Sequence, residues 1–456
     1  MNTSTNSSAR GTAPAFAMPG DAPSAARATL KLLMRLKHGT LTVKLPDGSV
    51  QRFGNGEAPM ASMHLLNWNV CSAALKSGDI GFAESFIAGD WTTPHLTELL
   101  RVFIVNRKEV ENVIYGTWLG RFVYRVKHLL NRNTKTNSQK NIHAHYDLGN
   151  AFYELWLDGT MNYSSAIFET PETSMKDAQH AKVRRALRMA QVKPGDRVLE
   201  IGCGWGALVE KAVLEFDASV VGVTLSTEQL AWAQARMARI GIDQYNESDA
   251  PFKQGPQNRL CRAAGAAASS GGSAPHAVGS VGAPFADLRL QDYRDIGKST
   301  PDAPFDAICS IEMVEAVGRE YWAEYFATVA RLLKPGGYAC IQSIVIADEL
   351  FDRYITSTDF IQQYIFPGGC LPCPREFRVQ AKAAGFEIVD EFKFGQDYAR
   401  TLELWRDDFM ANESRVLQLG FDKRFMRIWE FYLGYCEAAF KEANTDVMQF
   451  TLRKPA

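Results

Sequence analysis

The chain has 456 residues, of which 46% are hydrophobic and 22% charged, a composition typical of a folded protein with two or three domains. Its 50 basic and 51 acidic side chains give a formal net charge of -1, and basic and aromatic residues do not interleave, so no nucleic-acid partner is predicted. No apolar run is long enough to span a bilayer. The 8 cysteines and 8 histidines lack metal-site spacing, so we predict no metal and a cytoplasmic compartment with reduced thiols.

The amino-terminal quarter predicts a tail followed by a small α+β domain. Residues 1–24 are rich in Ser, Thr, Ala, Gly and Pro and have the composition of a disordered tail. A basic amphipathic helix is predicted from Arg27 to Lys37, and Thr40 to Phe53 alternates about a Pro-Asp-Gly turn, which indicates a hairpin. We expect a mostly helical stretch from there to about residue 130. Such a helix can lie on an anionic membrane surface, although the sequence alone favours an ordinary surface helix of a small domain.

The segment between Glu111 and Asp147 contains basic side chains and no acidic ones. Its basic residues are Arg121, Arg125, Lys127, Arg132, Lys135 and Lys140. This stretch suits phospholipid headgroups, and it also fits a solvated helix face followed by a polar linker. We therefore predict a membrane-associated or lipid-associated domain at 25–130, a linker at 131–140 and a second domain at 141–456.

From residue 197 onward, short β-branched segments alternate with amphipathic helical segments. The expected strands are Arg197–Ile201, Ser219–Val223, Asp306–Ile311 and Tyr338–Ile346, and the expected helices are Leu208–Phe216 and Glu228–Ile240. This alternation predicts a doubly wound, Rossmann-like α/β domain, in which helices cover both faces of a parallel sheet. An Ala-, Gly- and Ser-rich segment at 246–284 interrupts the pattern, and we interpret it as a flexible insertion.

The first of these strands runs into a turn with Gly202, Gly204 and Gly206, which permits a sharp bend and close approach of a ligand. The spacing differs from the dinucleotide G-x-G-x-x-G, and Glu200 precedes the first glycine by two residues, where a carboxylate favours a cationic sulfonium over a pyrophosphate. The second strand ends at Ser226 without the acidic residue that a nicotinamide site requires. The pattern favours S-adenosylmethionine over NAD, with a purely structural glycine turn as the alternative.

Further motifs occur in a characteristic order along the chain. They are Tyr146 to Asn150, Met161 to Ala166, Leu199 to Gly206, Val223 to Ser226, Leu290 to Asp295 and Tyr364 to Pro372. Together they resemble the cyclopropane-fatty-acyl-phospholipid synthase family and the related mycolic acid cyclopropane synthases, over nearly the whole chain except the tail and the insertion. The resemblance implies transfer of a one-carbon unit from S-adenosylmethionine to the double bond of an unsaturated phospholipid acyl chain, which forms a cyclopropane ring.

The resemblance also implies which residues bind the cofactor. The predicted set, including the carboxylate and glycines of the turn, is Tyr163, Ser164, Glu200, Gly202, Gly204, Gly206, Thr224, Ser226, Gln229 and Gln291. An alkene is a weak nucleophile, so methyl transfer requires close placement and exclusion of water, and it leaves a carbocation that aromatic faces can stabilise. The aromatic candidates are Tyr163, Trp205, Tyr364, Phe366 and Tyr398, although such residues more often fill cores.

In the family, a bound bicarbonate ion removes a proton from the new methyl group. Residue by residue, the resemblance places its contacts at Cys203, Glu315, Ile344 and Tyr398, while Gln342 stands where the family often has histidine. Gln342 can donate a hydrogen bond to an oxyanion but cannot titrate. If bicarbonate is absent, Glu315 is the next candidate for the base, provided that burial raises its pKa; alternatively, Glu315 caps the following helix.

Several outcomes remain open from the sequence. Loss of a different proton would give a methyl or methylene branch instead of a ring, and a partner oxidoreductase could complete that reaction. A lipid-binding module without catalysis and methylation of a soluble small molecule are further alternatives. We expect 360–374 and 427–440 to wall an acyl tunnel, and the resemblance implies a peripheral enzyme at the inner face of the membrane, with a homodimer as one assembly.

Overall fold

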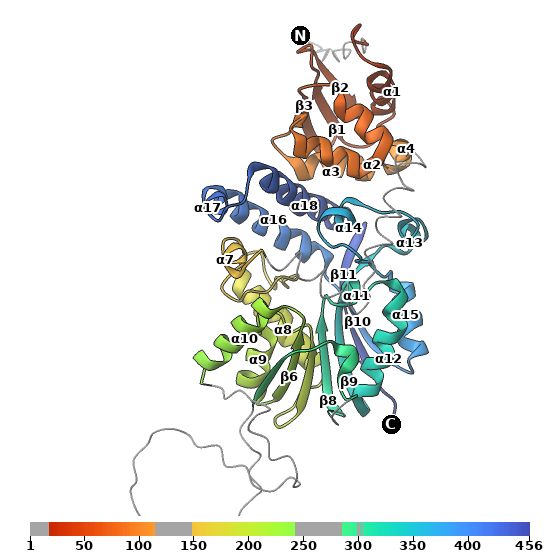
Figure 1. Cartoon of the computed structure of the whole chain (residues 1–456). Helices are drawn as coiled ribbons and strands as arrows, with labels where there is room; N and C mark the ends of the chain where they lie inside the picture. Colours follow the sequence, from red (N-terminus) through yellow and green to blue (C-terminus); the bar gives the residue numbers. More distant parts are fainter. Residues whose placement is uncertain (1–17, 115–147, 242–284, 299–301, 303) are drawn as a thin grey trace, which may run out of the picture. The chain divides into compact units, whose positions relative to one another are not determined.

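The computed structural model describes residues 18–114, 148–241, 285–298, 302 and 304–456, and it divides into two compact units, 1–117 and 118–456 (Figure 1). The predicted linker at 131–140, the predicted insertion at 246–284 and residues 1–17 of the predicted tail lie outside the described residues. None of the helices in the described ranges is both long and apolar enough to cross a membrane.

The first unit is a small α+β structure built around a four-stranded sheet. Its elements are α1 (Ser24–Leu33), β1 (Thr40–Lys44), β2 (Val50–Gly54), β3 (Met60–Leu65), α2 (Asn69–Ala88), β4 (Trp91–Thr92), α3 (Leu96–Val105) and α4 (Arg107–Ile114). The strand order is β2-β1-β3-β4. β1 and β2 form the predicted hairpin, in which Leu41 pairs with Phe53, and β3 runs parallel to β1.

The first unit differs from the sequence prediction in two places. α1 begins at Ser24, three residues before the predicted start and directly after the extended Pro23, and it ends at Leu33, four residues before the predicted end. Residues 18–24, predicted as part of the tail, belong to the described residues. β3 and β4 lie in the stretch predicted to be mostly helical. In β3 the buried residues are Ala61, Met63 and Leu65, a period of two that identifies a strand with one buried face.

The second unit contains a seven-stranded sheet with helices on both faces. Its first half comprises α7 (Asn150–Tyr153), α8 (Met175–Met189), β5 (Arg197–Ile201), α9 (Ala207–Phe216), β6 (Ser219–Thr224), α10 (Thr227–Arg239), β7 (Ala286–Leu290) and β8 (Phe305–Ile311). The second half comprises α11 (Val314–Val317), α12 (Trp322–Leu332), β9 (Leu333–Ile346), α13 (Asp348–Tyr354), α14 (Phe360–Tyr364), α15 (Pro374–Ala383), β10 (Glu387–Lys393), α16 (Gly395–Ala411), α17 (Glu413–Gln418), α18 (Lys423–Lys441) and β11 (Thr445–Arg453).

The strand order β10-β11-β9-β8-β5-β6-β7 confirms the doubly wound, Rossmann-like prediction. The strands β7, β6, β5, β8 and β9 are parallel, whereas β11 runs antiparallel to both of its neighbours. β5 lies between β6 and β8. The strand order therefore reverses at β5, because β6 and β7 extend the sheet on one side of it and β8 and β9 extend it on the other. Ligands of open α/β sheets bind at the carboxyl ends of the strands where the order reverses in this way.

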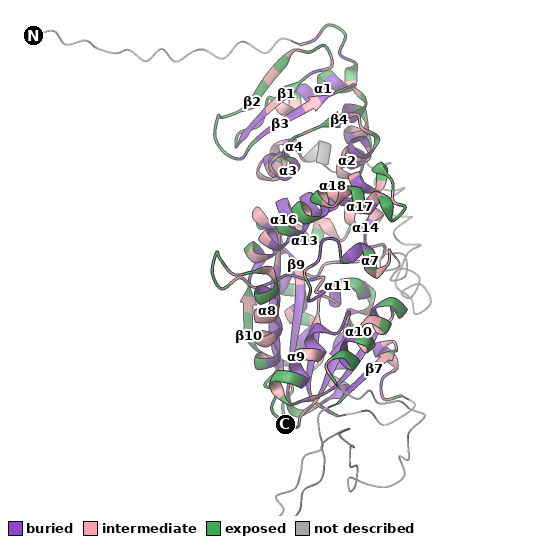
Figure 2. Ribbon diagram, turned by 90° about the vertical axis from the view of Figure 1, so that its left-hand side faces the viewer, coloured by how far each residue is buried: buried purple, intermediate pink, exposed green. Residues whose placement is uncertain are grey.

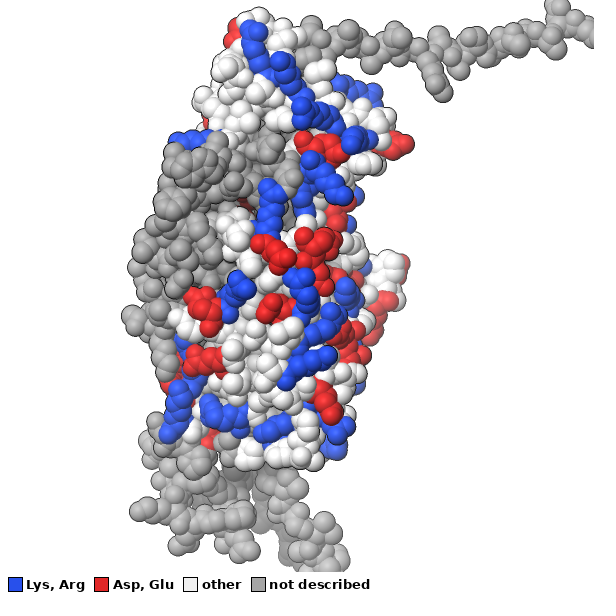
Figure 3. Space-filling model, turned by 90° about the vertical axis from the view of Figure 1, so that its right-hand side faces the viewer, with Lys and Arg blue, Asp and Glu red and all other residues white. Residues whose placement is uncertain are grey.

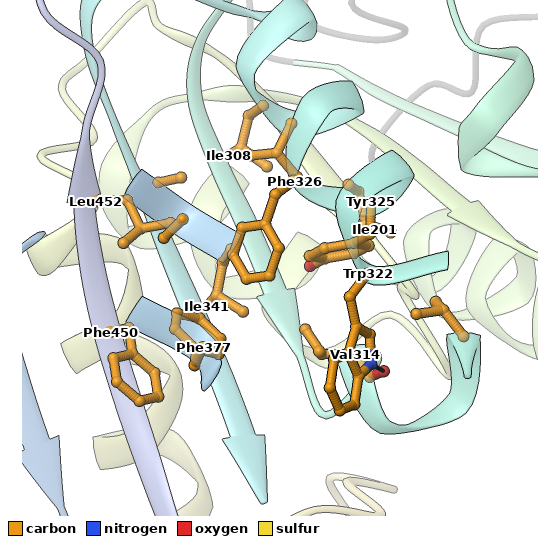
Figure 4. Packing of buried hydrophobic residues seen from close by; sticks show 14 of the residues in the cluster. Ile201, Ile308, Val314, Trp322, Tyr325, Phe326, Ile341, Phe377, Phe450 and Leu452 are labelled. Atoms are coloured by element: carbon orange, nitrogen blue, oxygen red, sulfur yellow. Dashed lines mark hydrogen bonds between the residues drawn. The ribbon is translucent and has the colours of Figure 1, made fainter. Parts of the chain in front are cut away.

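The central strands of this sheet are buried on both faces and appear mostly purple in Figure 2, whereas the edge strand β10 has no buried residue. Successive residues of β5 belong to opposite cores, since Leu199 packs against the α12 and α15 side and Val198 against the α8 and α9 side. In the first of these cores, the Phe377 ring stacks on Phe450 at a centroid distance of 3.7 Å (Figure 4). Burial of each such side chain stabilises the fold by about 1.5–3 kcal/mol.

Candidate active site

The turn after β5 has the geometry that the glycine pattern predicts. The backbone N–H groups of Gly202 and Cys203 both donate to the carbonyl of Val223 at the end of β6, at 2.9 and 3.0 Å. Gly202 has a φ of +84°, and a Cβ at this position would lie 2.4 Å from the side chain of Met313. Glycine is therefore required here both by the backbone conformation and by the close approach of the β8 end.

A cavity opens at this turn, between the carboxyl ends of the central strands. Its wall contains eight of the ten predicted cofactor residues, namely Tyr163, Ser164, Glu200, Gly202, Gly204, Thr224, Gln229 and Gln291. The Thr224 hydroxyl donates to Oε1 of Gln229 at 3.0 Å, which fixes the amide at the cavity wall. Asp292 and Arg294, which form a 2.6 Å ion pair, also line the cavity but were not predicted individually, although both lie in the Leu290 to Asp295 motif.

The other two predicted cofactor residues have structural roles and do not line this cavity. Gly206 precedes the first residue of α9, and a Cβ there would lie 3.1 Å from the Cβ of Ala233, so this glycine permits close packing of α9 on α10. Ser226 caps α10, because its hydroxyl accepts from the backbone N–H of Gln229 at 3.2 Å. Sequence spacing alone does not separate such packing and capping positions from ligand contacts.

Two buried ionisable side chains, Glu200 at the cavity wall and Lys182 near it, influence each other's pKa. Glu200 is 3% exposed, and its Oε2 has no hydrogen-bond partner among the residues that the structure describes. Lys182, on α8, is fully buried and donates to Oγ of Ser164 at 2.5 Å and to Oδ1 of Asn162 at 3.3 Å. Burial raises the pKa of Glu200 to about 8 and lowers the pKa of Lys182 to about 8. An unsatisfied carboxylate oxygen at the wall fits a cationic ligand such as S-adenosylmethionine.

Glu312, which directly follows β8, was not predicted from the sequence as a site residue. It lines the cavity and accepts three hydrogen bonds, from the Tyr398 hydroxyl to Oε2 at 2.7 Å, and from Nε2 of Gln342 and the backbone N–H of Ser165 to Oε1 at 2.8 and 3.0 Å. Its φ of +54° is uncommon for a residue with a side chain. Burial raises the pKa of Glu312, while these hydrogen bonds and the charge of Lys182 act in the opposite direction.

The donors predicted to hold bicarbonate are all directed to acceptors of the chain itself. Gln342 and Tyr398 donate to Glu312, the Cys203 N–H donates to a carbonyl of β6, and the Ile344 N–H donates to Oε1 of Glu315. The Glu315 side chain thus accepts a hydrogen bond from β9, which does not support the alternative that it caps the following helix. Oε2 of Glu315 is buried and has no hydrogen-bond partner within the described part of the chain, and burial raises the pKa of Glu315 to about 8. This donor set does not fit an added bicarbonate ion.

Aromatic side chains surround the cavity wall at Tyr163. The Tyr163 ring lies 5.4–5.5 Å from the rings of Tyr153, Trp156 and Trp405, and its hydroxyl lies 2.7 Å from that of Tyr432. The two segments predicted to wall an acyl tunnel also meet, since Phe360 on α14 packs edge-to-face on Phe431 of α18 at 4.8 Å. Tyr398, which the sequence predicted to be catalytic, stacks its ring on Phe440 of α18 at 4.4 Å.

The sheet order, the glycine turn at its switch point and the carboxylate beside it define a class I methyltransferase that depends on S-adenosylmethionine. The solved cyclopropane synthase MmaA2 from Mycobacterium tuberculosis is 28% identical, with a TM-score of 0.56 over 69% of this chain and 98% of that one. A structure of mycolic acid cyclopropane synthase CmaA1, complexed with SAH and CTAB, is 29% identical, with a TM-score of 0.55 and the same coverage.

The sequence comparisons narrow this class to one family. The family model described as mycolic acid cyclopropane synthetase matches residues 133–250 and 276–450, which is more than half of the chain. The tuberculostearic acid methyltransferase UfaA1 of Mycobacterium tuberculosis is 33% identical over 95% of this chain and 92% of that protein. The cyclopropane-fatty-acyl-phospholipid synthase of Escherichia coli K12 is 31% identical over 87% of this chain and 88% of that protein. The chain belongs to the cyclopropane synthase family.

Proposed function

We propose that this enzyme transfers a one-carbon unit from S-adenosylmethionine to the double bond of unsaturated fatty acyl chains of phospholipids and closes a cyclopropane ring. The observation that carries the proposal is the composition of a single cavity wall. There the glycine turn, the buried carboxylates Glu200 and Glu312 and the aromatic Tyr163 face one space. The name of the Escherichia coli relative, which is similar over 87% of this chain, supports the same substrate class.

Different residues of the chain would contribute to different steps of such a reaction. When bound, S-adenosylmethionine supplies an electrophilic methyl group. The glycine turn leaves room for it, and Glu200 offers a carboxylate to its positive charge. Tyr163 and Trp205 present aromatic surface to the cavity, which excludes water and stabilises a cationic carbon of the acyl chain. A buried carboxyl at the wall can then accept the proton that ring closure releases.

The proposal includes peripheral association with the inner face of the membrane through the first unit. Arg27, Lys31 and Arg35 recur at four-residue spacing at and just beyond α1, and all three are exposed, as is Met34 with 55% of its surface. Lysine and arginine side chains also form a row on the part of this unit drawn at the top of Figure 3. Basic side chains next to an exposed apolar one favour adsorption to anionic lipid. The homodimer and the partner oxidoreductase stay predictions.

The test is incubation of the purified protein with methyl-labelled S-adenosylmethionine and vesicles of unsaturated phospholipid. Mass spectrometry and proton NMR of the released acyl chains should show one added carbon and high-field cyclopropyl protons. Vesicles of saturated phospholipid are the matched control and should take up no label. Label that enters only soluble small molecules, or no turnover at all, would overturn the proposal.

The membrane contact has a test of its own. Reversing the charges of Arg27, Lys31 and Arg35 should reduce co-sedimentation with anionic vesicles.

A second candidate is C-methylation of the acyl chain, which leaves a methyl or methylene branch. The relative that is 33% identical over 95% of this chain is named a tuberculostearic acid methyltransferase, and this name favours the branched product. The two outcomes start from the same carbocation and differ in which proton is lost. Vinylic or branched-methyl signals in the NMR assay, with no cyclopropyl protons, would decide for the branch.

A further inference from the structure

The acceptor at the centre of the predicted anion site is a side chain of this enzyme. Gln342 and Tyr398, two of the groups expected to hold a bicarbonate ion, both donate to the carboxylate of Glu312. A third donor, the N–H of Ser165, comes from the motif that also carries the cavity residues Tyr163 and Ser164. The Glu312 carboxylate, which accepts these three hydrogen bonds, therefore offers planar oxygen acceptors of the kind that a bicarbonate ion would offer.

We propose that the Glu312 carboxylate takes the place of bicarbonate and is the base that removes a proton from the newly attached methyl group. This inference rests on the proposed function, because it assigns the base for that ring closure. It replaces the sequence-based candidate, Glu315, and it names a catalytic residue that neither the family resemblance nor the motif reading assigned.

The step balances without any further reactant. One alkene carbon forms a bond to the methyl carbon as the bond between sulfur and that methyl group breaks, which leaves S-adenosylhomocysteine and a positive charge on the second alkene carbon. Oε2 of Glu312 then takes one proton from the new methyl group. The electron pair of that C–H bond forms the bond to the cationic carbon and closes the ring. Glu312 ends as the neutral acid and returns its proton to solvent before the next turnover.

The hydrogen-bond inventory of Glu312 leaves room for this proton. An ionised carboxylate has about four acceptor positions. Among the described residues, Oε1 accepts from Gln342 and Ser165, whereas Oε2 accepts from Tyr398 alone, so these contacts leave one acceptor position on Oε2 unused. The same donors hold the carboxylate in one orientation, which a base needs in order to reach a particular C–H bond.

Location separates Glu312 from Glu315. Glu312 lines the cofactor cavity, whereas Glu315, three residues later in the sequence, is not among the lining residues. The Glu315 carboxylate instead accepts from the N–H of Ile344 on β9. Glu312 and Glu315 lie close enough for the charge of Glu312 to raise the pKa of Glu315, while the buried Lys182 favours the charged form of Glu312. A bicarbonate ion at this place would add a further negative charge beside these two carboxyl groups, and like charges disfavour each other.

The backbone at Glu312 is consistent with a functional position. Its φ of +54° lies in the left-handed region, which costs conformational energy for any residue with a side chain and is found most often where function requires it. The preceding residue, Ile311, still belongs to β8, so this conformation ends the strand and turns the carboxylate into the cavity.

The first test measures anion binding to the protein without the methyl donor. Wild-type protein titrated with [13C]bicarbonate should show no saturable binding by NMR, because Glu312 already occupies the donors. Glu312→Ala removes that carboxylate and should create a saturable bicarbonate site. Saturable binding to wild type that is unchanged in Glu312→Ala would overturn the inference.

The second test measures ring formation in buffer freed of carbon dioxide. Wild type should keep its full rate without bicarbonate, and Glu312→Gln should lose at least about 100-fold in cyclopropane formation while S-adenosylhomocysteine binds as before by calorimetry. Formate or bicarbonate should restore part of the rate to Glu312→Ala. Glu324→Gln, the same change at an exposed carboxylate of α12, is the matched control and should behave as wild type. A wild type that requires bicarbonate overturns this inference alone, whereas one that forms no cyclopropane with or without bicarbonate overturns the proposed function as well.

Discussion

The hydroxyl of Tyr398 donates a 2.7 Å hydrogen bond to Oε2 of Glu312, a residue 86 positions earlier in the chain. This contact joins α16 to the end of β8. Both side chains are buried, so the hydrogen bond to the charged carboxylate is worth more than it would be in water. The strength of this contact helps to set the pH at which Glu312 can act as a base.

Replacing Tyr398 by Phe should therefore move the pH dependence of the reaction. A hydrogen bond to the ionised form lowers a carboxyl pKa, so its loss raises the pKa of Glu312 above its already raised value. Activity requires the ionised form and falls as the pH drops through this pKa, so the acidic limb of the kcat profile should shift to higher pH. The rate at the optimum should fall by about 10-fold or more. An unchanged acidic limb would contradict this prediction, and Glu312→Asp should retain a measurable acidic limb.

Binding of S-adenosylmethionine should weaken as the pH falls below about 8. Burial raises the pKa of Glu200 to about 8, so the free protein carries the neutral acid below that pH, and the cation-binding carboxylate must first lose a proton. Lys182, with a pKa of about 8, gains its charge over the same range and acts in the same direction. Calorimetry should give a loss of up to about tenfold in affinity per pH unit for each group that titrates. Glu200→Gln should bind more weakly at high pH and show a flatter profile; an equally steep profile would rule out Glu200.

Four of the five parallel strands could be predicted from the sequence, whereas β7, β10 and β11 were not predicted. β5, β6, β8 and β9 are buried on both faces and appear as apolar, β-branched runs between helices. β11 buries Gln449 and Thr451 in the sheet, and β10 alternates between exposed and half-buried residues, so neither shows a clear apolar pattern.

The cofactor turn could likewise be predicted, because its residues are contiguous. The relation of Glu312 to Tyr398 and Gln342 could not, because these residues lie directly after β8, on α16 and on β9, and they meet only in the folded chain. The positive φ that directs the carboxylate into the cavity also leaves no signal in the residue type at Glu312.

The glycine at 202 should be essential for the cofactor site and not for the fold as a whole. Gly202→Ala places a Cβ 2.4 Å from the Met313 side chain in a backbone conformation with a φ of +84°. Either the turn or the β8 end must shift, so we expect S-adenosylhomocysteine binding to be lost by calorimetry, with the far-ultraviolet circular dichroism retained. Gly241→Ala is the matched control, because its φ is +73° but none of the described residues lies within 4 Å of an added Cβ. Equal loss of binding in both variants would mean that backbone strain, and not the contact with Met313, is responsible.

Truncation of Phe377 should destabilise the second unit without changing its ligand affinity. The ring stacks on Phe450 of β11 at 3.7 Å and meets Phe326 of α12 edge-to-face at 4.9 Å, so it joins α15 to two further elements of the core. Phe377→Ala leaves a cavity among these rings and should lower the free energy of unfolding by about 3–5 kcal/mol in urea titrations. Val379→Ala, on the same helix but 53% exposed, should change it by less than about 0.5 kcal/mol. Because Phe377 does not line the cofactor cavity, calorimetry on the folded variant should return the wild-type affinity for S-adenosylhomocysteine, and a large loss of affinity would mean that this core supports the cavity wall directly.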